Sequence, residues 1–66
     1  MEERSKTFIA LDAMGGDLGP YAVIEGASIV CEEHKDIFFN IYGDTNIVSD
    51  LINKFPLLKK RSKIIH

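Results

Sequence analysis

The chain carries two apolar runs of strand character, separated and followed by stretches with helical spacing. Residues 7–11 (TFIAL) are mostly apolar and β-favouring, which predicts a strand buried on both faces. Residues 37–42 (IFFNIY) are aromatic and β-branched, which predicts a second strand. Ile64 and Ile65 begin another apolar run, which indicates the start of a third strand.

Two helices are predicted between these strands. The first runs from about Pro20 to His34, because proline suits the first turn of a helix and apolar residues recur there at helical spacing. Thr45 is in position to cap a second helix, which Pro56 ends or distorts. The apolar stripes of the two helices are formed by Val23, Ile24, Ala27, Val30 and Cys31, and by Ile47, Val48, Leu51, Ile52 and Phe55.

The resulting order, β-α-β-α(-β), predicts the α/β class. Alternation of this kind is typical of a Rossmann-like parallel sheet with right-handed crossovers. A short sheet with helices on one side leaves one face and one edge bare. We therefore interpret residues 1–66 as the N-terminal portion of a single larger α/β domain, with residues 1–6 frayed.

Composition excludes several classes of protein. With 45% apolar and 27% charged residues, the chain is globular rather than disordered. A net charge of −2 gives no strong attraction to nucleic acid. A single cysteine fits a reducing compartment, the start has no secretory pattern, and no apolar run approaches the roughly 20 residues of a membrane span. A cytoplasmic location is the expectation.

Residues 12–20 contain the candidate chemistry. A strand ends at Asp12, glycines follow at Gly15, Gly16 and Gly19, and a helix then begins. Loop amides and a helix N-terminus together can stabilise an anion or a carbonyl that becomes negative during reaction. The spacing does not fit the dinucleotide fingerprint, the P-loop or the nucleophile elbow. The alternative is that Gly15 and Gly16 only permit a tight turn.

The sequence leaves two alternative roles for each of three aspartates. Asp12, at the end of a buried strand, needs a partner, either loop amides or a ligand. Asp17 either caps the first helix or takes part in function. Asp44 resembles the acid that contacts a ribose in dinucleotide folds, but turn formation with Gly43 is favoured.

Two further groups of residues have ordinary interpretations. Cys31 and His34 are three apart on a helix and could share a metal, but two ligands make a poor site. A core cysteine and a surface histidine are favoured, and no metal or cofactor is predicted. The basic run, Lys59, Lys60, Arg61 and Lys63, could meet an acidic partner or an anionic membrane, but a solvated connector is favoured.

The stretch IALDAMGGDLGP resembles the opening of the bacterial phosphate acyltransferase family (PlsX). The family's Asp-Ala-Met-Gly-Gly-Asp-x-Gly-Pro loop is matched without a break by residues 12–20. The later stretch 41–44 (IYGD) is similar to the family's second strand, which ends in Gly-Asp. The resemblance covers nearly all of this chain, but only an N-terminal portion of a family member.

The resemblance implies acyl transfer from acyl carrier protein to inorganic phosphate, giving acyl phosphate for phospholipid synthesis. It also implies homodimers that work in the cytoplasm near the membrane. On this basis Asp12 and Asp17 are catalytic candidates, and the substrate-binding residues are Asp12, Met14, Gly15, Gly16, Asp17 and Gly19. Two alternatives stay open, namely a nucleotide-binding half-domain that uses Asp44 and a structural fragment that associates with itself. The isolated chain is expected to be inactive.

Overall fold

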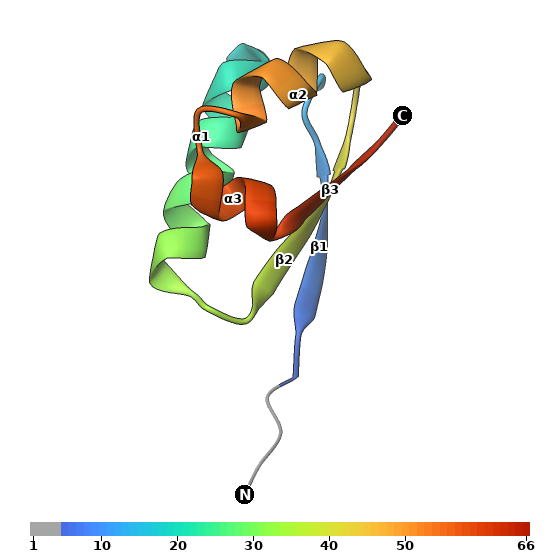
Figure 1. The fold of residues 1–66 in the computed structure, drawn as a ribbon. Coiled ribbons are helices and arrows are strands. Elements are labelled where there is room, and N and C mark those ends of the chain that lie inside the picture. Colours follow the sequence, from blue (N-terminus) through green and yellow to red (C-terminus); the bar gives the residue numbers. More distant parts are fainter. Residues whose placement is uncertain (1–4) are drawn as a thin grey trace, which may run out of the picture.

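The computed structural model describes residues 5–66. Its elements follow the predicted order, with one additional short helix (Figure 1). They are β1 (Thr7–Asp12), α1 (Gly19–Glu33), β2 (Ile37–Tyr42), α2 (Thr45–Ile52), α3 (Pro56–Lys60) and β3 (Ser62–Ile65). Four of the six residues predicted to be frayed lie outside the described residues.

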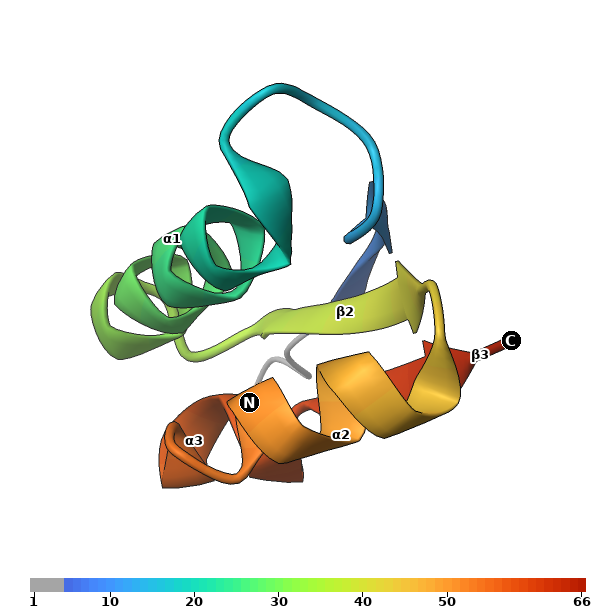
Figure 2. The same ribbon diagram turned by 90° about the horizontal axis from the view of Figure 1, so that it is seen from above.

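The three strands form one parallel sheet in the order β1-β2-β3. Ile9 lies opposite Phe39, and Ile41 lies opposite Ile64, so apolar side chains from all three strands share one face. All the helices lie on that face, with α1 in contact with both α2 and α3 (Figures 1 and 2). The α/β class and the Rossmann-like arrangement are confirmed.

The core lies between the sheet and this helical layer. Its strand side comes from Phe39 and Ile41, which alternate with outward-facing residues of β2. Ile24 and Leu58 are among the residues with no solvent-exposed surface. The complete buried set is Ala13, Ile24, Ala27, Cys31, Phe39, Ile41, Val48, Ile52 and Leu58.

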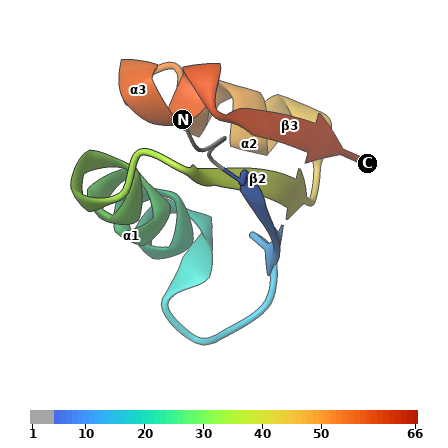
Figure 3. The same ribbon diagram turned by 90° about the horizontal axis from the view of Figure 1, so that it is seen from below.

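The prediction that the first strand is buried on both faces was wrong. In β1 the side chain of Phe8 is 61% exposed and that of Ile9 is 36% exposed, and only Leu11 packs partly against the core. The reason is that β1 is an edge strand whose outer face has no covering layer among the described residues, as Figure 3 shows from below. Its apolar composition is that of an internal strand, while its surroundings in this chain are those of an edge.

Two predictions for the second half of the chain were also wrong. Asp44, not Thr45, is the N-cap of α2, because an aspartate one position earlier already supplies the capping oxygen. Pro56 does not end α2 but begins α3, where proline is tolerated in the first turn. Ile47 is 43% exposed and Phe55 precedes α3, so neither belongs to a buried stripe on α2.

The basic run is not a solvated connector throughout. Lys59 and Lys60 form the last turn of α3, and Lys63 lies in β3. The guanidinium of Arg61 donates from Nη1 to the carbonyl oxygens of Cys31 and His34, both at 2.9 Å. Arg61 therefore pairs with backbone carbonyls at the C-terminal end of α1, where a cation is favoured by the helix dipole.

Candidate functional site

The predicted loop lies at the carboxyl edge of the sheet, where ligands collect in open α/β folds. The strand ladder continues past the strand ends there, because the Ala13 amide donates to the Tyr42 carbonyl at 2.9 Å and the Gly43 amide donates to the Ile65 carbonyl at 3.1 Å. The connection from β1 to α1 extends outward from this fixed edge (Figure 2).

Asp12 organises the start of the loop. Its Oδ1 accepts hydrogen bonds from the amides of Met14 at 3.0 Å and Gly15 at 3.1 Å. A Cβ added to Gly15 would lie 3.0 Å from Asp12 Oδ2, so a larger residue there would disturb this turn. Loop amides, one of the two kinds of partner considered for Asp12, therefore do bind its carboxylate. The Gly15 amide, one of the proposed anion donors, is thereby directed at Asp12.

Two of the three loop glycines are required by backbone conformation. Gly16 has φ of +91° and Gly19 has φ of +85°, values that side chains of L-amino acids rarely adopt. A Cβ added to either residue would have no heavy atom within 4 Å. Gly16 and Gly19 therefore do permit the turn, as the alternative interpretation expected. The open space beside Gly16 also leaves its backbone accessible.

The N-terminus of α1 has no side-chain cap. Its N-cap residue is Leu18, and no side chain accepts a hydrogen bond from the first turn. The interpretation of Asp17 as a cap was therefore wrong, because the helix begins one residue too late for that role. The amides and the positive dipole end of a 15-residue helix remain available beside the loop.

A pocket of about 230 Å³ lies where the loop meets α1. It is lined by Gly15, Gly16, Asp17, Leu18, Ala22 and Val23. Five of these six residues carry no charge, so a ligand there would meet backbone and apolar surface on most sides. Asp17 is the one ionisable side chain among them.

Met14 connects the first loop to the second. A Cβ added to Gly43 would lie 3.0 Å from Met14 Cγ and 3.1 Å from Val48 Cγ2, so Gly43 is needed for close packing. Met14 itself remains 44% exposed. Sequence reasoning assigned Gly43 only to a turn, because the approach of Met14 depends on the tertiary fold.

Asp44 has a structural role in this fold. Its Oδ1 accepts hydrogen bonds from the amides of Asn46 at 3.0 Å and Ile47 at 3.2 Å, which caps α2. The carboxylate is thus engaged by the helix that follows it. The favoured interpretation was turn formation with Gly43, whereas the hydrogen bonds of Asp44 make it the cap of α2.

We expect Asp44→Ala to lower the free energy of unfolding by about 0.5–2 kcal/mol, because two amides of α2 lose their acceptor. Asp44→Ser should recover most of that loss, since serine is also a good N-cap. Urea unfolding followed by circular dichroism measures both variants. Asp50→Ala on the exposed face of α2 is the control, and an equal loss in that variant would contradict the capping role.

Sequence reasoning missed the surroundings of Tyr21, in the first turn of α1. The Lys54 ammonium lies 5.9 Å from the centre of the Tyr21 ring, and the Phe55 ring centre lies 6.1 Å away. A cation from the second half of the chain thus lies beside the first turn of α1. No local sequence signal marks this contact, because 33 positions separate Tyr21 from Lys54 (54 minus 21).

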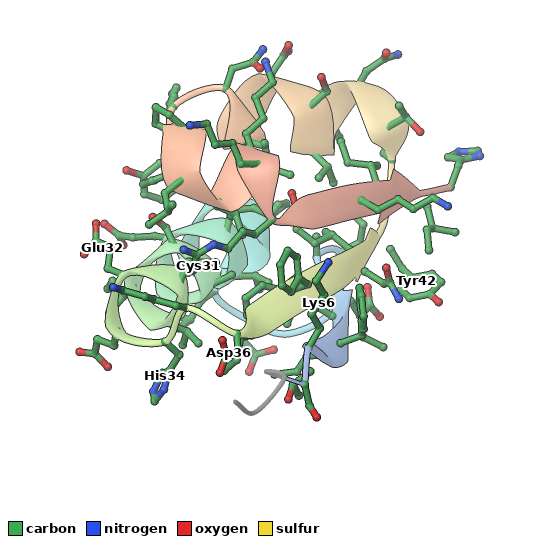
Figure 4. All side chains as sticks on the ribbon, turned by 60° about the horizontal axis from the view of Figure 1, so that its bottom comes forward. Lys6, Cys31, Glu32, His34, Asp36 and Tyr42 are labelled. Carbon is green, nitrogen blue, oxygen red and sulfur yellow. The ribbon has the colours of Figure 1, made fainter. Side chains whose placement is uncertain are left out.

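Cys31 and His34 do not form a site together. Cys31 is 1% exposed and faces the core, whereas His34 is exposed and points away from the helix end (Figure 4). Burial raises the pKa of the Cys31 thiol, and the nearby Arg61 charge opposes this only in part, so the thiol is a poor nucleophile. Within residues 5–66, no group of three or more histidine, cysteine or acidic side chains could hold a metal.

Among the described helices, none is long and apolar enough to span a membrane. The site is thus a glycine-rich loop between a parallel strand and an uncapped helix. This architecture defines the chain as part of an α/β protein with a Rossmann-like parallel sheet.

Comparison with known proteins identifies the family. A curated phosphate acyltransferase from Rhodopseudomonas palustris (strain TIE-1) is 46% identical over 61 residues, which are 92% of this chain and 17% of the relative. The enzyme of the same name from Bradyrhizobium diazoefficiens is 47% identical over 62 residues, 94% of this chain and 18% of the relative. That from Parvibaculum lavamentivorans is 50% identical over 58 residues, 88% of this chain and 16% of the relative. No family model and no solved structure matches the chain.

The predicted resemblance is therefore confirmed, since the chain matches an N-terminal fragment of the phosphate acyltransferase family at 46–50% identity. It spans about 17% of the length of the first curated relatives. The names of these relatives describe, in general terms, enzymes that transfer an acyl group.

Proposed function

We propose that loop residues 12–20 of this chain bind phosphate in an enzyme that transfers an acyl group from acyl carrier protein to inorganic phosphate. The observation that carries the proposal is the open loop at the uncapped N-terminus of α1, held in place by the Asp12 carboxylate. The similarity to curated phosphate acyltransferases supports the reaction class. The product, an acyl phosphate, would feed phospholipid synthesis.

Phosphate would lie against Gly16, Gly19 and the first turn of α1. The positive φ angles of both glycines leave their backbone unshielded by side chains, and helix amides without acceptors favour an anion. The Lys54 ammonium, 5.9 Å from the centre of the Tyr21 ring in this turn, would offset part of the phosphate charge.

In the reaction, a phosphate oxygen attacks the thioester carbonyl carbon. A C–O bond forms, the C–S bond breaks, and the proton carried by the phosphate passes to the departing thiolate. Negative charge develops on the carbonyl oxygen on the way, and backbone amides aimed at it would lower the barrier. Asp17, which lines the loop pocket, is the candidate to accept or relay the proton, while Asp12 positions the loop.

The partners follow from this reaction. Acyl carrier protein and inorganic phosphate are the proposed substrates, and the reaction needs no cofactor. The full-length enzyme is proposed to be a cytoplasmic homo-oligomer that works at the membrane periphery, without contact to nucleic acid.

A chimera tests the proposal. The homologous segment of the Rhodopseudomonas palustris relative is replaced by this chain, and acyl phosphate formation is measured with acyl carrier protein thioester and phosphate. We expect activity within about ten-fold of the parent enzyme, because loop residues 12–20 are all present. A folded chimera without transfer activity, beside an active parent, would contradict the proposed role.

The two aspartates are expected to differ within this chimera. Asp17→Asn should lower kcat by about 100-fold or more with little change in stability, since asparagine cannot accept the proton. Asp12→Asn should retain most of the rate, because its amide oxygen still accepts from Met14 and Gly15, whereas Asp12→Ala should not. Steady-state kinetics and thermal melting measure both effects, and equal losses in the two asparagine variants would refute this division of roles.

A further inference from the structure

The side chain of Met14 links loop residues 12–20 to the second connection of the sheet, which joins β2 to α2 (Figure 2). A Cβ added to Gly43 in that connection would lie 3.0 Å from Met14 Cγ, 3.3 Å from Met14 Sδ and 3.1 Å from Val48 Cγ2. Carbon atoms in favourable contact are about 3.5–4.0 Å apart, so a side chain at this point would crowd both neighbours. The bare backbone of Gly43 is what lets Met14 approach.

Space, not backbone conformation, requires glycine at position 43. Gly16 and Gly19 have positive φ angles, whereas Gly43 does not. The Gly43 amide donates to the Ile65 carbonyl at 3.1 Å, and an alanine amide would keep that hydrogen bond. A methyl group at this position would therefore act only through the atoms that it displaces.

Of the two neighbours, Met14 is the one that can move. Val48 is fully buried and β-branched, so it has few alternative rotamers. Met14 is 44% exposed, and methionine is unbranched and flexible. Because Met14 Cγ is bonded directly to Cβ, displacing it needs either a new χ1 rotamer, which breaks the contact, or a shift of the Met14 backbone, which moves the loop.

The backbone of Met14 belongs to the turn that Asp12 organises. The amides of Met14 and Gly15 both donate to Asp12 Oδ1. Ala13, the residue before them, is fully buried, whereas residues 16–18 after the turn are exposed. The direction of the exposed part of the loop is therefore set at the turn, where Met14 contacts the second connection.

We propose that Met14 is a positioning residue for phosphate binding, because its contact with Gly43 and Val48 fixes the direction in which residues 15–19 leave the sheet. This inference rests on the proposed function, which places phosphate against the loop. Met14 acts here through the backbone amides of the loop and not by contact with the reacting atoms. Glycine at position 43 is the counterpart of this role in the second connection.

Phosphate kinetics of the chimera test the role. Gly43→Ala should raise the KM for phosphate about ten-fold and leave kcat within about three-fold, because misplaced loop amides bind phosphate less well throughout the reaction. Met14→Ala removes the contact and should raise the KM similarly. The double variant makes room for the added methyl group and should return the KM to within about three-fold of the parent, a non-additive result.

NMR of the 66-residue chain tests the contact without any enzyme activity. Gly43→Ala should shift the amide signals of Gly16 and Gly19, although neither is close to position 43 in sequence. Gly26→Ala is the matched control, because a Cβ added there has no heavy atom within 4 Å and the φ of Gly26 is not positive. It should leave the signal of Gly16 unchanged.

The two measurements separate this inference from the proposed function. Loop signals that do not respond to Gly43→Ala would overturn the positioning role, whatever the chimera does. An unchanged phosphate KM in an active, folded Gly43→Ala chimera would overturn it too, as would a double variant no better than the single ones. A folded parent chimera without activity would instead refute the proposed function, and with it the part of Met14 in phosphate binding.

Discussion

A Gly16→Val chimera is expected to form acyl phosphate at least about 100-fold more slowly than the chimera with the native loop. Gly16 has φ of +91°, which a β-branched residue adopts only with strain of about 1–3 kcal/mol. The peptide would turn to relieve that strain, and the amides proposed to face phosphate would turn with it. Losing one such donor costs about 100-fold to 1000-fold in rate in acyl-transfer enzymes.

Two variants make this result specific. Gly16→Asn should lose less activity than Gly16→Val, because asparagine tolerates positive φ better than other side chains. Glu25→Val places the same valine on an exposed position of α1, away from the loop, and should keep the parental rate. Rates are compared at a temperature where melting curves show every variant folded, and full turnover in folded Gly16→Val would refute the role of the loop.

The boundaries of the first three elements could be predicted because they depend on local sequence. The spacing of Val23, Ala27 and Val30 and the turn residues near Gly19 placed α1 within one residue at each end. The limits of β2 were matched completely. Local patterns also placed Asp12 and the glycines at the correct edge of the sheet.

Burial of β1 could not be predicted in the same way. The apolar residues between Thr7 and Leu11 describe a strand with neighbours on all sides, but burial depends on which elements are present to cover it. Within residues 5–66 only β2 pairs with this strand, and no layer covers its outer face. The apolar pattern of a strand therefore indicates how deeply the strand is suited to be buried. It does not show which neighbouring elements are present to bury it.

In the candidate site, too, some features follow from local sequence and others depend on tertiary contacts. That Asp12 needs a partner followed from chemistry, but the choice between a ligand and the amides of Met14 and Gly15 required coordinates. The place of Lys54 beside Tyr21 depends on how α1 packs against the segment that joins α2 to α3. Contacts across such distances in sequence are set by tertiary packing, which no local motif encodes.

The isolated 66-residue chain is expected to show no measurable acyl transfer, although it contains the complete loop. Thioester transfer to phosphate needs donors on several sides of the reacting carbon and a site that excludes water. The loop and the start of α1 provide one side. Arg61 cannot provide another, because it binds the opposite end of α1, about 20 Å away along a 15-residue helix.

Phosphate binding by the isolated chain should also be weak. Asp12 and Asp17 both lie at the loop, and Lys54 lies beside the first turn of α1, so charge does not favour binding of a dianion. We expect phosphorus NMR titration to give a dissociation constant above about 1 mM for the isolated chain, and at least ten-fold tighter binding in the chimera. The matched transfer assay uses equal concentrations of chain and chimera with the same thioester. Acyl phosphate production by the isolated chain at a rate near that of the chimera would show that the loop alone suffices for catalysis.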